Sequence, residues 1–159
     1  MFPSGSTFSK GTHTVTVTGA DLAGNTNTCT FTITVLDKEA PRVQCRPAPN
    51  PSGKLSEPGN PGRRGVNPSG YYELLANDNC DSSPKIYIKD TGSPFVAGPF
   101  TDGDIVRLKH AGGSASSSPG RAPVVATISL KGNGLAIAKD ADGNVTPDAS
   151  GCVMAVSLK

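Results

Sequence analysis

Residues 12–36 read THTVTVTGADLAGNTNTCTFTITVL, and this stretch decides the fold class. On both sides of its centre, polar and apolar residues alternate with a period of two, which is typical of half-buried β-strands. The central LAGN segment, residues 22–25, supplies glycine and asparagine, the residues that tolerate the positive φ angles of tight turns. The pattern therefore predicts a β-hairpin.

Part of this stretch recurs near the end of the chain. The D-x-x-G-N pattern of residues 21–25 returns at residues 140–144, and a G-S-x-F-x-x-G pattern occurs at residues 5–11 and again at 92–98. Self-similarity of this kind is the signature of repeated modules. The chain therefore contains two copies of one unit.

The two copies have unequal room for strands. Few residues precede the turn of the first copy, whereas the second copy has space for a full set of strands before its turn. We therefore expect residues 1–39 to be the truncated C-terminal part of one module and residues 40–159 to be a whole domain. The polar segment DKEAP, residues 37–41, is the expected junction.

Short strands separated by turn residues account for most of the second copy. Two segments, residues 47–69 and 111–122, are expected to be long loops because they are rich in proline or in glycine and serine. In residues 134–139 the alternation allows two arrangements: Ala136 and Ala138 face inward, or a bulge shifts the register. Seven short strands with such turns predict an all-β fold, a β-sandwich. We expect these strands at residues 42–46, 70–76, 85–89, 104–109, 123–130, 134–139 and 152–158.

Composition and charge exclude several function classes. A net charge of +2 on 159 residues gives no basic surface for nucleic acid. No apolar run approaches the ~20 residues of a membrane span, so we expect no membrane insertion. The two histidines, His13 and His110, fall in no motif with an acid and a nucleophile, so we expect no enzyme activity.

Acidic residues gather in two loops. Asp78 and Asp81 lie in NDNCD, while Asp140, Asp142 and Asn144 lie in DADGN. Oxygen ligands at alternating positions beside a glycine resemble part of a calcium loop. Both loops should lie at one pole of a sandwich, so we predict a weak calcium site formed by these five residues and no other cofactor. The alternative is that the same residues only make hairpin turns, which Asp, Asn and Gly favour.

The first copy lacks most of its sister strands. An isolated hairpin is marginally stable in water, and its edges offer unpaired backbone groups to another strand. Three outcomes follow: the hairpin folds back on the second domain, is disordered, or pairs with another chain. We hypothesise the last, strand-mediated self-association through residues 12–36.

The order of motifs in residues 4–37 resembles the end of a hyalin repeat (HYR), an extracellular immunoglobulin-like module. The family pattern runs G-S-x-F-x-x-G, an alternating strand, D-x-x-G-N and then C-x-F-x-V-x-V. APRVQC, residues 40–45, resembles the opening of the next repeat, and LANDNCD, residues 75–81, resembles its middle. Residues 40–159 as a whole resemble a divergent, expanded copy. The resemblance implies an immunoglobulin-like sandwich.

The resemblance also implies a disulfide between Cys45 and Cys152. Cys29 occupies the later of these positions in the first copy, with its partner expected upstream of the chain. Cys80 is additional, and the sandwich topology places it near the same pole, so it is a rival partner. Four reduced cysteines in a cytosolic protein remain the alternative.

For function, the resemblance implies a non-catalytic structural or adhesion module of a secreted or surface protein. A signal sequence would lie upstream, and the partners would be other modules of the same protein, surface proteins or glycans. The alternative is a calcium- or glycan-binding recognition domain that uses the apical loops.

Overall fold

The computed structural model describes residues 5–48, 70–112 and 124–156. Internal contacts divide the chain into two compact units, Met1–Lys38 and Glu39–Lys159. Nearly all of the two predicted loops, residues 47–69 and 111–122, lies outside the described residues.

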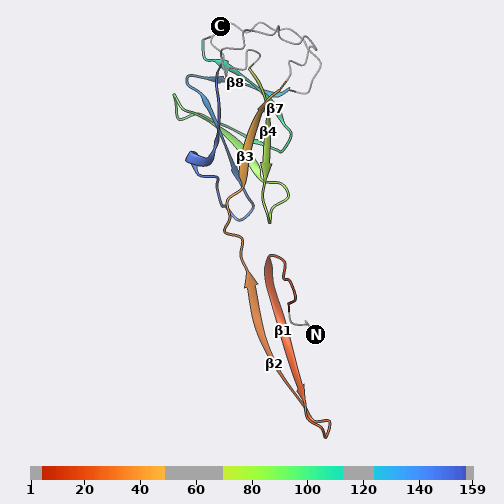
Figure 1. The fold of residues 1–159 in the computed structure, drawn as a ribbon. Coiled ribbons are helices and arrows are strands. Elements are labelled where there is room, and N and C mark those ends of the chain that lie inside the picture. Colours follow the sequence, from red (N-terminus) through yellow and green to blue (C-terminus); the bar gives the residue numbers. More distant parts are fainter. Residues whose placement is uncertain (1–4, 49–69, 113–123, 157–159) are drawn as a thin grey trace. The chain divides into compact units, whose positions relative to one another are not determined.

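The first unit is the predicted hairpin. Strands β1 (Gly11–Ala20) and β2 (Thr26–Val35) pair antiparallel without a register shift (Figure 1). Because side chains alternate along a strand, the two faces differ completely. One face is apolar and carries Val15, Val17, Cys29, Phe31 and Ile33. The other is built of four threonine pairs: Thr12 with Thr34, Thr14 with Thr32, Thr16 with Thr30, and Thr18 with Thr28.

The second unit is a sandwich of two four-stranded sheets, in the orders β3-β4-β7-β8 and β10-β9-β5-β6. The prediction of an all-β fold is confirmed. Its only described helical element is the short 3₁₀ turn η1 (Asp148–Ser150). The strands are β3 (Arg42–Pro47), β4 (Tyr71–Asn77), β5 (Lys85–Asp90), β6 (Val96–Phe100), β7 (Ile105–His110), β8 (Val124–Leu130), β9 (Gly134–Lys139) and β10 (Cys152–Met154).

The strand order follows the immunoglobulin pattern. Strands β3, β4 and β7 take the places of A, B and E, while β5, β6, β9 and β10 take those of C, C′, F and G. Strand β8 departs from the pattern. It occupies the sheet edge where strand D would lie, but it follows β7 in sequence and pairs with it in parallel.

The core lies between the two sheets. Inward-facing residues of the strands are almost fully buried, including Leu74, Ile86, Ile88, Val106, Leu108, Leu130 and Met154. Ala136 and Ala138 are 0% exposed, so the first of the two arrangements for residues 134–139 is confirmed. Strand β9 is central in its sheet, and its small alanines leave room for the larger side chains around them.

Two details differ from the strands predicted by alternation. Strand β6 was not predicted, because its sequence VAGPF contains a glycine and a proline and no alternation. Strand β10 ends at Met154, well before the predicted residue 158, and residues 157–159 lie outside the described part. No helix among the described residues is long and apolar enough to cross a membrane.

Candidate functional site

The two acid-rich loops of the second unit meet at one pole of the sandwich. The backbone N–H of Ala141 donates a hydrogen bond of 2.9 Å to Oδ2 of Asp81. This bond ties the loop between β4 and β5 to the loop between β9 and β10. The shared pole inferred from the sequence is therefore present.

The D-x-x-G-N loop is a turn closed by its own side chains. Asn144 donates to both carboxylate oxygens of Asp140, through its backbone N–H at 2.8 Å and its Nδ2 at 2.7 Å. Gly143 has a φ of 91°, which a side chain would disfavour. Burial acts to raise the pKa of Asp140, but the hydrogen bonds that its carboxylate accepts, those from Asn144 first, together hold that pKa below its ordinary value.

The first copy repeats this turn atom for atom. Asn25 donates to Asp21 through its backbone N–H at 2.8 Å and its Nδ2 at 2.7 Å, and Gly24 has a φ of 87°. The hydrogen bond from the Asn25 side chain is the main reason that the pKa of Asp21 is lowered. Two copies with one set of bonds show that Asp140 and Asn144 form a turn whatever else they bind.

Asp78 and Asp81 also fold their own loop. Oδ1 of Asp78 accepts hydrogen bonds from the backbone N–H groups of Cys80 at 2.9 Å and Asp81 at 2.8 Å. Oδ1 of Asp81 accepts one from Ser83 at 2.9 Å. Oδ2 of Asp78 is buried and has no hydrogen-bond partner among the described residues. This oxygen is therefore shielded from solvent and accepts no hydrogen bond from the described residues.

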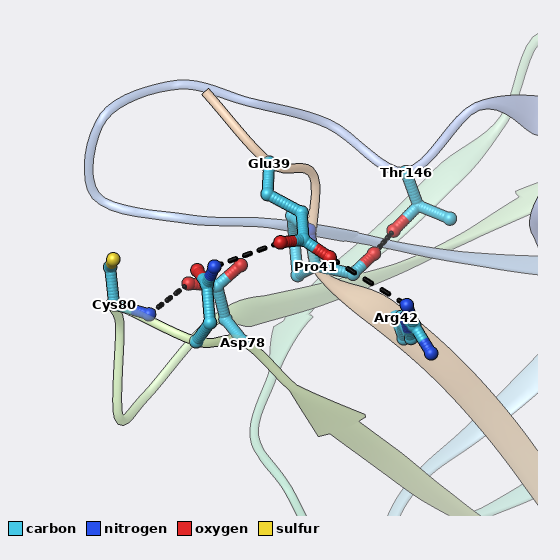
Figure 2. A network of polar contacts seen from close by, with 7 residues as sticks. Glu39, Pro41, Arg42, Asp78, Cys80 and Thr146 are labelled. Carbon is cyan, nitrogen blue, oxygen red and sulfur yellow. Dashed lines mark hydrogen bonds and ion pairs between the residues drawn. The ribbon is translucent and has the colours of Figure 1, made fainter. Parts of the chain in front are cut away.

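A small pocket of about 240 Å³ lies beside Asp78. Oε1 of Glu39 lies 3.7 Å from the Arg42 guanidinium (Figure 2). Oε2 of Glu39 accepts a hydrogen bond of 2.8 Å from Nδ2 of Asn79. The remaining lining comes from Ala40 and Asn77. The pocket thus combines carboxylate, amide and guanidinium groups in a small volume.

The start of β3 is anchored to the same pole. The hydroxyl of Thr146, a residue that is 3% exposed, donates to the carbonyl oxygen of Pro41 (Figure 2). The same hydroxyl accepts a hydrogen bond from the N–H of Ala138. The contact with Pro41 joins the first strand of the unit to the segment that follows its D-x-x-G-N turn. The pole is therefore rigid where the chain enters the sandwich.

The five predicted calcium ligands are only partly brought together. Ligand oxygens of Asp140 and Asp142 lie within 4.8 Å of each other. Within the described residues of the second unit taken alone, no three acidic, histidine or cysteine side chains approach this closely. Asp81 contacts the backbone of the neighbouring loop instead. The calcium site stays a prediction, and the turn-forming role of these residues is directly visible.

The cysteines are arranged as the resemblance implies. Cys45 of β3 and Cys152 of β10 form a disulfide with a Cα–Cα distance of 5.9 Å across 107 residues of sequence. The rival partner Cys80 is exposed and takes no part in it, and Cys29 is exposed in the first unit. The disulfide joins the first and last strands of the sandwich, which belong to different sheets.

A buried acid at the opposite pole was not predicted from the sequence. Asp90 ends β5, is 6% exposed, and accepts four hydrogen bonds of 2.7–2.9 Å: from the backbone N–H groups of Lys131, Gly92 and Gly132 and from the hydroxyl of Ser93. The bond from Lys131 is the main reason that the pKa of Asp90 lies far below its ordinary value. Asp90 therefore links the β5–β6 turn to the β8–β9 turn through hydrogen bonds to both.

The two histidines each contact a neighbouring carbonyl. Nε2 of His13 lies 2.8 Å from the oxygen of Ser9, and Nδ1 of His110 lies 3.1 Å from that of Ala111. Both contacts are local in sequence, so each ring is positioned by the backbone next to its own strand.

The fold and this pole together define the class: a disulfide-linked β-sandwich module preceded by a hairpin with the same D-x-x-G-N turn. In a comparison with known protein families, residues 1–35, which include most of the β1–β2 hairpin, match the model of the HYR domain. No curated protein and no solved structure matches the chain.

Proposed function

We propose that the chain is a non-catalytic structural or adhesion module of a secreted or surface protein. The observation that carries this proposal is the disulfide between β3 and β10. Disulfides of this kind persist in oxidising compartments. The HYR match over residues 1–35 supports the same assignment, because hyalin repeats are extracellular modules.

The position of the disulfide suits a spacer under tension. Residue 39 begins the second unit, and the covalent path from there to the C-terminus can run through Cys45 and Cys152. That path bypasses the residues between the two cysteines, which are 107 positions apart in the sequence. A pull on the ends is then borne by a covalent bond rather than by the sheet hydrogen bonds.

Single-molecule pulling on the full chain tests this role. In the oxidised protein, unfolding should release only the residues outside the bypassed loop. Reduction should add roughly 350 Å of extension, since an extended chain spans about 3.4 Å per residue. The Cys29→Ser variant is the matched control and should behave like the wild type. Equal extension in oxidised and reduced protein would refute the spacer role.

A second candidate, calcium-dependent recognition, is supported by the Asp140–Asp142 pair. Like charges within 4.8 Å repel unless a cation or donors lie between them. The buried Oδ2 of Asp78 at the same pole accepts no hydrogen bond from the part of the chain that the structure describes. Glycans are the other ligand class for these apical loops.

Calcium titration separates the two candidates. Binding to the native state alone raises the melting temperature by linkage, so a saturable rise that Asp142→Asn abolishes supports recognition. Asp142→Asn is preferred to Asp140→Asn because Asp140 also closes the turn. If calcium does not change the melting temperature, calcium-dependent recognition is rejected and the spacer role is kept.

A further inference from the structure

The turn between β8 and β9 contains the one Asn-Gly pair of the sequence, Asn133-Gly134. Asn-Gly is the dipeptide most prone to deamidation, because glycine has no side chain to hinder attack of its backbone nitrogen on the preceding amide. Asn133 is exposed, and Gly134 begins β9. The Asp-Gly pairs at residues 102–103 and 142–143 react more slowly by the same route, since an ionised carboxylate is a poor electrophile.

Close packing explains the glycines on both sides of Asn133. A Cβ added to Gly134 would lie 3.1 Å from Cδ1 of the core residue Leu108. A Cβ added to Gly132 would lie 2.6 Å from the backbone nitrogen of Gly92, in the neighbouring β5–β6 turn. Glycine within or beside a strand often marks such a close approach. The packing of the second unit therefore favours a Gly-x-Gly sequence here, and an asparagine at its centre is chemically labile.

The backbone of Asn133 is fixed by Thr91 of the β5–β6 turn. The Thr91 hydroxyl accepts a bond of 2.8 Å from the N–H of Asn133 and donates one of 3.1 Å to the carbonyl oxygen of Asn133. The N–H of Thr91 donates to the same oxygen at 3.0 Å. Gly134 is aligned with Asp90 of β5 and with Met154 of β10. Cyclisation requires the Gly134 nitrogen to turn toward the Asn133 side chain, so this region must first open locally.

The side chain of Asn133 is held far less firmly than its backbone. Within the part of the chain that the structure describes, its one hydrogen bond is a long contact of 3.5 Å, from the N–H of Val156 to Oδ1. The amide carbon is therefore free to react once the backbone is released. The firmly bonded backbone, rather than the side chain, controls the reaction.

We infer that Asn133 is a deamidation site whose rate is controlled by its hydrogen bonds to Thr91. The Gly134 nitrogen forms a bond to Cγ of Asn133 and loses its proton, while the bond from Cγ to Nδ2 breaks and ammonia leaves with that proton. Water then opens the cyclic imide: OH adds to one carbonyl carbon and H to the ring nitrogen. Residue 133 becomes aspartate or isoaspartate, and water is the only co-reactant. The inference is independent of the proposed function.

Isoaspartate at this position would break the link between the two turns. It adds one carbon to the backbone, so the N–H and the carbonyl oxygen of residue 133 lose the spacing that matches Thr91. The two residues before it, Lys131 and Gly132, donate their backbone N–H groups to Asp90. A new carboxylate beside this segment also adds a charge of the same sign as that of Asp90. Deamidation should therefore destabilise the second unit.

Peptide mapping of the full chain after incubation at neutral pH tests the inference. Deamidation at Asn133 should be at least about tenfold slower in native protein than in urea-unfolded protein, because it requires local opening. Thr91→Val removes the hydroxyl and keeps the branched shape, so it should raise the native rate at least about threefold, as expected for the loss of hydrogen bonds. Thr127→Val, at an exposed position of β8, is the matched control and should leave the rate unchanged.

Aged wild-type protein supplies a readout that does not depend on how Thr91→Val folds. The fraction deamidated at residue 133, separated by charge, should melt at a lower temperature than the unmodified fraction. Three results would overturn the inference: equal rates in native and unfolded protein, equal native rates in wild type and Thr91→Val, or equal melting temperatures of the two fractions. Faster conversion of a different asparagine in the unfolded chain would overturn the choice of site.

Discussion

The chain contains one hairpin design in two surroundings. The hairpins β1–β2 and β9–β10 share the turn bonds, the positive-φ glycine and the cysteine opposite the preceding strand. In the second unit, Ala136 opposite the cysteine is fully buried and Cys152 is bonded to Cys45. In the first unit, Val17 opposite the cysteine is 49% exposed. Local sequence therefore makes the hairpin, and only the remaining strands of a module make it a core element.

Loss of the Cys45–Cys152 disulfide should have the largest effect on this contrast. Cross-linking a loop of about a hundred residues stabilises by about 4–5 kcal/mol in the chain-entropy description, and native-state strain reduces that figure. Urea unfolding of the Cys45→Ser/Cys152→Ser double variant should show most of this loss. Cys29→Ser is the control and should leave the midpoint unchanged. A double variant as stable as wild type would show that the bonded Cys152 contributes no more to stability than the unbonded Cys29.

Truncation of a core side chain should come next. Ile88 is 0% exposed between the sheets, so Ile88→Ala should lower the free energy of unfolding by about 2–5 kcal/mol. Phe31→Ala in the hairpin should cost less than about 1 kcal/mol, because Phe31 is half exposed. Both values come from denaturant unfolding followed by circular dichroism. Equal costs would show that the apolar face of the hairpin is already covered in the monomer.

Asp90 should make the second unit sensitive to acid. Its pKa in the folded state lies below the ordinary 3.8, so it stabilises the fold fully above that pH and loses this contribution as pH falls below it. The melting temperature of the wild type should therefore drop below about pH 4 more steeply than that of Asp90→Asn. Parallel profiles for the two proteins would argue against a linking role for this carboxylate.

The smallest effects should come from the paired turns. Asp140→Asn and Asp21→Asn remove the same charge from the same bonded turn. Asp140 is 5% exposed and holds the loop that joins β9 to β10, so its replacement should lower the melting temperature measurably. Asp21 is exposed, so its replacement should leave the melting temperature nearly unchanged. A larger loss from Asp21→Asn would reverse the comparison.

Sequence reasoning succeeded where the signal is local. Alternation predicted β1, β2 and most strands of the second unit. It failed at β6, where VAGPF has no alternation and pairing with β5 decides the structure. It left the inward face of residues 134–139 open, because alanines carry little hydrophobic signal and only the neighbouring strands show that Ala136 and Ala138 are buried.

The candidate site was predictable in position and only partly in role. Asp and Asn beside glycine fit both calcium loops and turns, and the bonds of Asp140 and Asn144 are set by geometry that composition cannot distinguish. Asp90 was missed because KDTGS resembles an ordinary turn. Its burial depends on the loop at residues 131–133, far away in the sequence. The pairing of Cys45 with Cys152 came from the family resemblance.

The central claim is that the two hairpins share one local structure, and that only β9–β10 is covered by further strands. Native-state hydrogen exchange on dilute protein without reductant tests this claim. At concentrations where the chain is monomeric, the amides of β9 that bond to β5 should exchange only through global unfolding. The amides of β1 and β2 should exchange far faster, through local opening of an isolated hairpin. Equal, high protection in both hairpins would contradict the account.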